Sequence, residues 1–225
     1  MNEKIAIALP HWAQQVWEPF FWSWTKMLAT TLTQRPGNYT ILKPALASQP
    51  ENDKKNIAQI RNNLVEQAFD DVCTKIIMMD SDQTPPPDTI IKLLSHDLPI
   101  VTGMTCRRYP PFDPILLRGE VYKYSSIPDE EMFTGELVEI DATGGGCMCI
   151  DMKVFLDVKY PWFADIPADE THKLVGEDLA FWSKVRSEGY KIHCDTSIEI
   201  GHLALREINK YDYMIYRKIE GAKRK

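Results

Sequence analysis

Short apolar runs that end at prolines or carboxylates divide the first half of the chain into predicted strands. The first run covers residues 4–9 and stops at Pro10, and a shorter one covers residues 39–42. The run from Ile76 to Met79 is apolar on both faces, which is typical of a central parallel strand with helices above and below it. A fourth run over residues 99–104 completes the strands of one mostly parallel sheet.

Segments with apolar residues at helical spacing alternate with these strands. Residues 56–69 carry such residues three or four positions apart, and residues 88–94 form a shorter helix. Pro19 is expected to interrupt the chain before a helix over about residues 20–32. The alternation of strand and helix predicts an α/β fold, with a mostly parallel central sheet flanked by helices.

The second half of the chain has shorter apolar runs. Residues 115–140 are predicted to be β-rich and partly exposed, with a loop at 125–131, and Cys147 to Ile150 form another apolar strand. Four further elements are expected: a helix that ends at Gly189, short strands over 191–194 and 198–200, and a terminal helix from Glu207.

Length and charge limit the possible classes of protein. The chain of 225 residues is long enough for one full-sized core, and a hydrophobic fraction of 44% indicates a folded globule. We therefore expect a single domain over residues 1–225. A net charge of −6 gives no overall positive field for nucleic acid or anionic lipid.

The cysteines and the apolar runs suggest a location. The five cysteines are odd in number and show no paired CxxC motifs, so neither a disulfide framework nor a structural zinc site is indicated. No apolar run approaches the length of a bilayer span, and the first residues lack the layout of a signal peptide. We expect a soluble, cytoplasmic protein with no membrane span.

Two carboxylates one residue apart, Asp80 and Asp82, follow directly after the central apolar run. Ligands of open α/β sheets bind beyond the carboxyl ends of such strands. Two hard oxygen ligands at that place suit a divalent cation, which in turn can bind a diphosphate. The alternative is an ordinary polar turn, where Asp and Ser are common.

Three other segments carry candidate chemistry. Gly144 to Gly146 let the backbone approach a ligand closely, although a flexible turn is the alternative. Glu177 and Asp178 open a predicted helix, where acidic residues are also favoured by the helix dipole alone. Arg107 and Arg108 lie in a proline-rich loop and suit anionic groups of a substrate, with a solvated loop as the equal alternative.

Aromatic residues gather at two places. One is a cluster around Trp162, and the other lies between His11 and Leu32. Flat apolar rings stack on sugars or bases, but packing of a helix against the sheet is the favoured interpretation for most of the second group. Its tryptophans are Trp12, Trp17, Trp22 and Trp24.

The order of these elements resembles the GT-A glycosyltransferases, especially small family-2-like members of bacteria and phages. An α/β half ends in Asp80-Ser81-Asp82, a glycine-rich strand follows, then a Gly-Glu-Asp helix start, and a late strand closes with Gly201-His202. The resemblance extends from IAIALP to EIGHLA. It implies the GT-A fold, which is the Rossmann-like fold of nucleotide-diphospho-sugar transferases.

The resemblance also implies roles for these residues in the donor site. Asp80 and Asp82 would hold manganese or magnesium against the diphosphate of a nucleotide-sugar donor, with Ser81 between them, and His202 would complete the metal site. Imidazole favours manganese. The remaining donor-binding candidates are Pro10 beside the base, Arg61 near the nucleotide, and Gly144, Gly145 and Gly146 beneath the sugar.

The second half would act on the acceptor. Asp178 matches the general base of inverting enzymes, and Glu177 would orient the site or bind the acceptor. Arg107, Arg108 and Trp162 are the candidates for acceptor binding. Residues 1–105 would then form the donor-binding half, 106–205 the acceptor and catalytic half, and 206–225 a C-terminal helix or tail. The acceptor stays open between a glycan, a protein, a small molecule and a modified DNA base.

Two other functions compete with a glycosyltransferase. The Asp-X-Asp-X-Thr pattern that starts at Asp80 also fits a haloacid-dehalogenase-like phosphohydrolase, with Asp80 as nucleophile. That signature normally opens its domain, whereas here two strands and two helices precede it. A non-catalytic carbohydrate- or nucleotide-binding module is the other alternative, and the tryptophans fit it.

Overall fold

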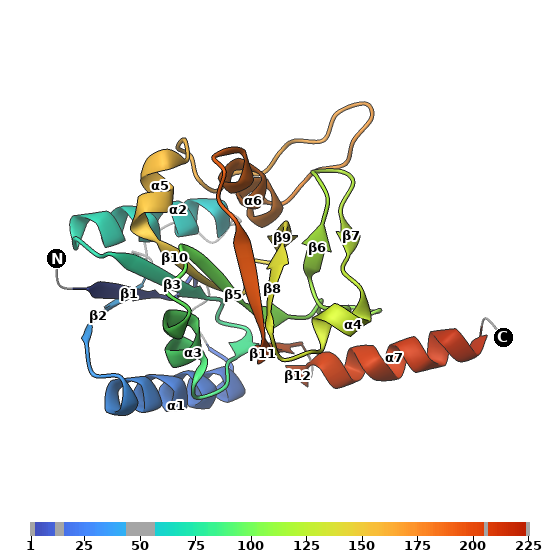
Figure 1. Ribbon diagram of the computed structural model, residues 1–225, viewed down its shortest axis with the longest axis horizontal. Coiled ribbons are helices and arrows are strands. Elements are labelled where there is room, and N and C mark those ends of the chain that lie inside the picture. The colour runs from blue at the N-terminus through green and yellow to red at the C-terminus, as the bar shows by residue number, and fades with distance from the viewer. Residues whose placement is uncertain (1–2, 12–15, 44–56, 205–206, 224–225) are drawn as a thin grey trace.

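A largely parallel sheet runs through the centre of the protein, which is a mixed α/β structure (Figure 1). The structure is a computed structural model that describes residues 3–11, 16–43, 57–204 and 207–223. Within these residues the strand order is β12-β11-β5-β10-β3-β1-β2, with β4 and β8 also paired to β11. The strands are β1 (Lys4–Ala8), β2 (Asn38–Leu42), β3 (Lys75–Met79), β4 (Gln83–Thr84), β5 (Ile100–Thr105), β8 (Leu137–Ile140), β10 (Cys147–Asp151), β11 (Ile192–Leu203) and β12 (Glu207–Ile208).

One antiparallel strand sits in the middle of this sheet. β1 is parallel to β2 and β3, and β5 is parallel to β11, whereas β10 runs antiparallel between β3 and β5. Met148 in β10 therefore lies opposite Met78 on one side and Thr102 on the other. A separate three-stranded sheet contains β6 (Leu116–Arg118), β7 (Ser125–Ser126) and β9 (Ala142–Thr143). Strands from both halves of the chain thus complete one central sheet.

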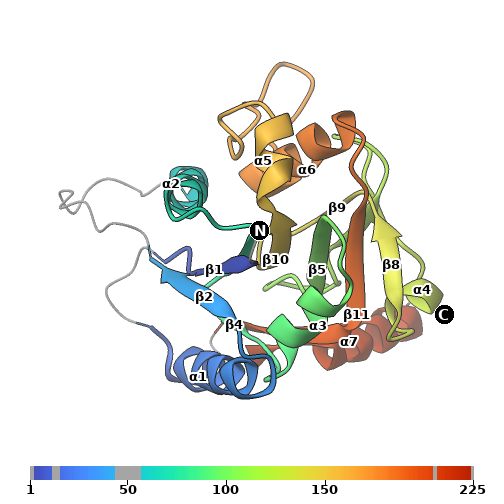
Figure 2. The same cartoon turned by 60° about the vertical axis from the view of Figure 1, so that its left-hand side comes forward.

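Helices cover both faces of the central sheet (Figure 2). α2 (Ile57–Asp70), α5 (Met152–Asp157) and α6 (Glu177–Ser187) contribute to one apolar cluster. α1 (Glu18–Gln34) and α3 (Thr89–Ser95) contribute to the other. Two helices remain, α4 (Asp129–Met132) and α7 (Lys210–Lys223), and α7 extends away from the sheet toward the C-terminus (Figure 1).

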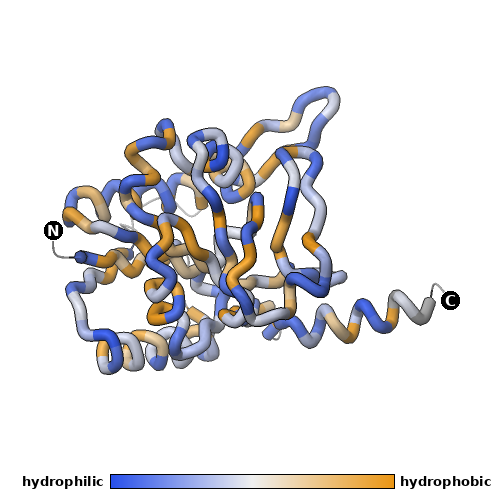
Figure 3. Tube along the Cα trace, in the orientation of Figure 1, coloured by the Kyte–Doolittle hydropathy of each residue, from blue (hydrophilic) through white to orange (hydrophobic). Residues whose placement is uncertain are grey.

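Alternate residues of the inner strands point into these two cores. In β3, Ile76 and Met78 belong to the cluster beside α2, while Ile77 and Met79 belong to the cluster beside α1. All four are fully buried, which confirms the sequence prediction of a strand covered on both faces. In Figure 3, apolar residues gather on the central strands, while apolar and polar residues alternate along α7.

The predicted start of the first long helix was wrong. Pro19 lies in the first turn of α1 and does not interrupt it. A first-turn residue needs no intrahelical partner for its backbone nitrogen, so proline fits there. Trp17, Phe21 and Trp22 are 49%, 48% and 53% exposed, so the expectation that most aromatic residues of this segment pack in the core was also wrong. Trp24 is partly buried and stacks on Phe20, and Trp12 lies outside the described residues.

Other differences are in the second half. β11 is one strand of twelve residues with a register shift between Asp195 and Glu199, where the sequence predicted two separate strands. Residues 152–157 form α5, which the sequence analysis missed, and residues 125–131 contain β7 and part of α4 as well as loop. In the part of the chain that the structure describes, no helix has the length and apolar character needed to cross a bilayer.

Candidate functional site

The segments that carry the candidate residues meet at one edge of the central sheet. β3 and β5 end at this edge, and antiparallel β10 begins there, so Asp80 lies beside the glycine segment. The backbone N–H of Asp80 donates to the Gly146 carbonyl over 3.1 Å. β4 pairs with β11, which brings His202 opposite Gln83 and close to Asp82. Because β10 runs antiparallel between β3 and β5, the glycine segment before it lies at the same edge as Asp80 and Asp82.

A buried arginine from α2 joins the two acidic segments. Arg61 is 2% exposed, and its Nη2 atom lies 2.9 and 3.0 Å from the two carboxylate oxygens of Asp80 and 3.2 Å from the Gly145 carbonyl. Its Nη1 atom donates to Glu177. Removing Arg61 or its carboxylate partners would leave a buried charge without a counter-charge, so Arg61 is part of the framework of the site.

Burial and like charge both act on the acidic residues around this arginine. Burial raises the pKa of Asp80, and the negative charges of Asp82 and Asp178 raise it further, against the attraction of Arg61. Burial also raises the pKa of Glu177, again against Arg61. For Arg61 burial works the other way, but the carboxylates outweigh it and raise the pKa of the guanidinium. The cluster of Asp80, Glu177, Asp178 and Arg61 therefore favours an additional positive charge.

The three glycines are buried against side chains of this framework. A Cβ atom on Gly145 would overlap the guanidinium of Arg61. On Gly146 it would lie 3.0 Å from Gln83, and on Gly144 3.0 Å from Ile115. Glycine at 145 thus lets the backbone approach Arg61. Packing against this arginine explains the glycine at 145, and no bound ligand is needed to explain it.

Asp82, His202 and Arg108 form the second part of the site. The Nδ1 atom of His202 donates to the Cys106 carbonyl over 2.8 Å, which turns Nε2 toward Asp82 at 3.6 Å. The guanidinium of Arg108 lies 3.2 and 3.3 Å from that Nε2 atom and also donates to Asp82. Burial would raise the pKa of Asp82, but its contacts with His202 and Arg108 lower it.

The donors at Asp82 and His202 fit a divalent cation. A ligating histidine usually donates its second nitrogen to a carbonyl, as His202 does, and the resulting pair of a carboxylate and an imidazole suits manganese. The third predicted ligand, Asp80, is directed to Arg61 instead. Over the described ranges, no group of three His, Cys, Asp or Glu side chains is arranged to hold a metal ion.

The candidate base is fixed by the backbone at the start of α6. The Oδ2 atom of Asp178 accepts the Gly145 N–H over 3.2 Å, and its Oδ1 atom accepts the Leu179 N–H over 2.7 Å. The side chain is only partly buried, so the carboxylate is oriented and still accessible. It lies on the same framework as Arg61, through Gly145.

The loop after β1 closes the site beside Ser81. The Ser81 hydroxyl and the His11 Nδ1 atom are 2.7 Å apart, and Pro10, which precedes this histidine, is buried. The sequence analysis missed His11. β1 and β3 are parallel neighbours, so their carboxyl ends lie at the same edge of the sheet. Ligands bind at this edge, so the position of His11 after β1 could have identified it as a candidate.

Two of the three acceptor candidates do not reach the site. Trp162 is 8% exposed and donates its indole N–H to the Phe155 carbonyl over 2.8 Å, so it packs in the core and is not available to an acceptor. Arg107 is exposed and pairs with Asp113 at 3.1 Å. Arg108 alone of the three contacts the candidate metal residues.

Comparisons with known proteins identify a shared fold. No protein-family model matches the sequence, and the search of curated proteins gives no match. The chain is similar to the crystal structure of A197 from STIV, with a TM-score of 0.56 and 14% identity over 90% of this chain and 86% of that one. At this identity the similarity shows the fold alone.

Two further solved structures are similar at a lower level. One is a glycosyltransferase involved in the glycosylation of the major capsid of PBCV-1, with a TM-score of 0.36 and 11% identity over 71% of this chain and 69% of that one. The other is the inositol-1-phosphate CTP transferase from T. maritima, with a TM-score of 0.48 and 11% identity over 96% and 95%. Both are transferases by name, but the similarity is too low to carry an argument.

Proposed function

We propose that the chain is a metal-dependent glycosyltransferase of the GT-A type, which moves a hexosyl group from a nucleotide-sugar donor to an acceptor hydroxyl with inversion. The observation that supports this proposal is the convergence of Asp82, His202 and Asp178 on one edge of the sheet. Small ligands of open α/β sheets bind at such an edge.

The donor would bind between the loops that follow β1 and β3. Asp82 and His202, with Asp80 after a change in its side chain, would hold Mn²⁺ or Mg²⁺. A bound cation supplies Lewis-acid stabilisation of the charge that develops on the departing diphosphate. Pro10 and Ser81 would border the nucleotide, with Gly144 to Gly146 beneath the donor sugar.

Asp178 would act as the general base. Its carboxylate takes the proton of the acceptor hydroxyl as that oxygen forms a bond to the anomeric carbon of the donor. The bond from the anomeric carbon to the diphosphate oxygen breaks, and its electron pair leaves with the diphosphate. Glu177 would hold Arg61, and through it Gly145, in the place that orients Asp178.

The position of Asp80 in the chain favours the transferase over the phosphohydrolase. The phosphohydrolase signature normally opens its domain, whereas two strands and two helices, β1, α1, β2 and α2, precede Asp80. The five cysteines are buried free thiols, which supports the proposal of a reducing, cytoplasmic location.

A panel of nucleoside diphosphates and nucleotide sugars tests the proposed function. We expect one nucleotide to raise the melting temperature when Mn²⁺ is present and not when it is absent, because a ligand of the native state stabilises it by mass action. Product analysis by chromatography should then show slow hydrolysis or transfer of the matching sugar. The Asp82→Asn variant should lose the metal-dependent shift. If no member of the panel stabilises the wild-type protein, the proposal is wrong.

A further inference from the structure

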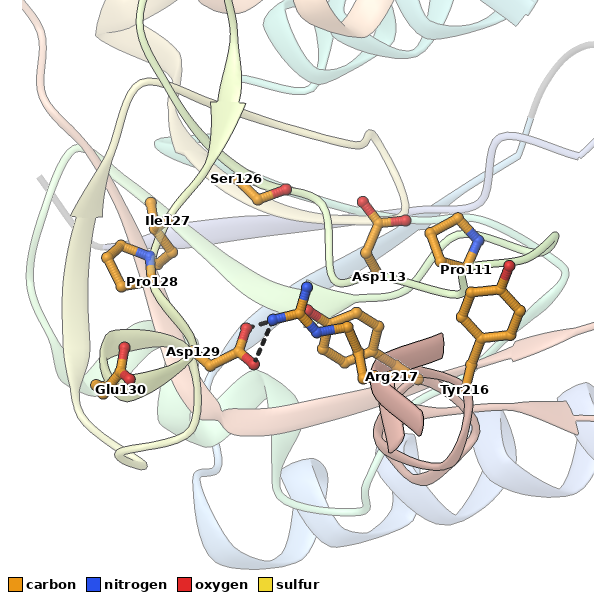
Figure 4. A pocket seen from close by; sticks show the side chains of 11 residues that line it. Pro111, Asp113, Ser126, Ile127, Pro128, Asp129, Glu130, Tyr216 and Arg217 are labelled. Carbon is orange, nitrogen blue, oxygen red and sulfur yellow. Dashed lines mark hydrogen bonds and ion pairs between the residues drawn. The ribbon is translucent and has the colours of Figure 1, made fainter. Parts of the chain in front are cut away.

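A cavity of about 820 Å³ lies outside the carboxylate site, between the loop after β5, the segment around α4, and α7 (Figure 4). This volume falls in the range of sites for small molecules. Pro111 and Asp113 line it on one side, Ile127 to Glu130 on another, and Tyr213, Tyr216 and Arg217 on the third. None of the roles proposed above uses it.

The walls of the cavity connect directly to the surroundings of His202. Cys106, whose carbonyl holds the His202 Nδ1 atom, forms a β-bridge with Pro114, and the Arg107 N–H donates to the Asp113 carbonyl over 2.9 Å. On the other side His202 pairs with Ile208, and α7 begins two residues later. Backbone contacts therefore join the walls of the cavity to both segments that hold His202.

Two tyrosines from α7 give the cavity flat apolar surface and a hydroxyl group. Tyr213 is buried and donates its hydroxyl to Asp129 over 3.0 Å, so its ring is fixed. The ring of Tyr216 packs edge-on against Phe112 with ring centres 6.1 Å apart, and Figure 4 shows it beside Pro111. Rings of this kind cover the C–H face of a sugar while hydroxyls bind around them.

Three carboxylates and one guanidinium line the cavity, and two of the carboxylates are in ion pairs. Arg217 pairs with Asp129 at 3.3 Å, as Figure 4 shows, and Asp113 pairs with Arg107 at 3.1 Å. Glu130 is exposed and has no ion pair within the described ranges. Carboxylates accept hydrogen bonds from hydroxyl groups, and a guanidinium donates to them. This lining suits a neutral polyol better than a phosphate.

We propose that this cavity is a carbohydrate-binding site and that it holds the acceptor of the transfer reaction. The acceptor role rests on the proposed function, whereas the binding of carbohydrate rests on the cavity itself. The sugar ring would lie against Tyr216, with its hydroxyls on Asp113, Glu130 and Arg217, and the end of the acceptor that reacts would extend toward His202 and Asp178.

Saturation-transfer NMR with the methyl glycosides of glucose, galactose, mannose and N-acetylglucosamine tests the site without donor or metal. We expect at least one glycoside to bind, and Tyr216→Ala to weaken that binding at least tenfold. Tyr211→Ala is the matched control, because Tyr211 lies on the same helix, is 61% exposed and does not line the cavity. Circular dichroism of both variants checks that α7 keeps its helix.

The outcomes separate this proposal from the proposed function. Failure of every glycoside to bind, or equal binding by Tyr216→Ala and wild type, would overturn the carbohydrate site. Glycoside binding that depends on Tyr216 supports it even if no nucleotide sugar is turned over, and in that case only the transferase is wrong. If transfer occurs and Tyr216→Ala leaves the KM for the acceptor unchanged, the acceptor role is wrong.

Discussion

The guanidinium of Arg108 contacts the Asp82 oxygen that faces His202, so an internal cation occupies the side of the carboxylate where a metal ion would bind. Both Nε and Nη2 of Arg108 also lie within 3.3 Å of the His202 Nε2 atom. A divalent cation and this arginine cannot use the same two acceptor atoms at once. Metal binding to the free protein must therefore displace Arg108.

Removing the charge of Arg108 should strengthen metal binding. We expect Arg108→Gln to bind Mn²⁺ on the order of ten times more tightly than the wild type, because the cation no longer competes with the guanidinium of Arg108. A factor of ten corresponds to about 1.4 kcal/mol. Electron paramagnetic resonance of free Mn²⁺ measures this without nucleotide or turnover. Arg107→Gln is the control, since Arg107 is next in sequence but pairs with Asp113. Equal affinity in the two variants would show that Arg108 does not compete.

Arg61 should support the fold as well as the site. Arg61→Met leaves Asp80 and Glu177 partly buried without their counter-charge, and breaking a buried pair in this way costs about 3–5 kcal/mol. The urea-induced unfolding midpoint should fall accordingly. The control is Arg35→Met, because the Arg35–Glu3 pair lies near the surface, where such pairs contribute about 1 kcal/mol or less. A similar loss in both variants would contradict the framework role.

Local pattern was sufficient to predict the central strand and the place of the acidic pair. The run Ile76 to Met79 is buried on both faces as expected, and Asp80 follows it at the edge where the neighbouring strands also end. These features depend on residues next to one another in the chain. The sequence could therefore predict the α/β class and the general location of the candidate site.

Long-range contacts set the features that the sequence did not predict. Arg61 meets Glu177 and Gly145 across 116 and 84 residues, and a position on the opposite face of α2 would have made it an exposed side chain. Aromatic residues were equally ambiguous. Trp162 is in the core and Trp22 is exposed, although both occur in aromatic-rich segments and the chemistry of the ring suits either place.

Asp195 should make the fold sensitive to acid. Burial would raise its pKa, but hydrogen bonds from His96 and Ser197 outweigh burial and lower it. A carboxylate with a lowered pKa stabilises the native state above the unfolded value of about 3.9, and this stability is lost as the pH falls through the native pKa. We expect Asp195→Asn to be about 1–2 kcal/mol less stable than wild type near pH 6.

This difference should shrink as the pH is lowered below about 4, because the carboxylate of the unfolded wild type then binds a proton that the native state binds only at lower pH. Urea unfolding at pH 6, 4 and 3 measures it. The exposed Glu170→Gln variant should track the wild type at every pH. A difference between Asp195→Asn and wild type that stays constant from pH 6 to pH 3 would contradict the assigned ionisation.

Asp178 gives the most direct test of the chemistry. Asp178→Asn keeps one acceptor oxygen, so it can retain the hydrogen bond from the Gly145 N–H and with it the donor site, while it gives up the one from the Leu179 N–H. The amide cannot take a proton from the acceptor, and loss of a positioned general base lowers the rate by about 10²–10⁴-fold. We expect transfer to fall by that factor while the metal-dependent thermal shift with nucleotide is unchanged. Glu188→Gln, at the exposed end of the same helix, should transfer at the wild-type rate. A normal rate of transfer in Asp178→Asn would show that Asp178 is not the general base. Loss of the thermal shift would show that Asp178 binds the donor instead.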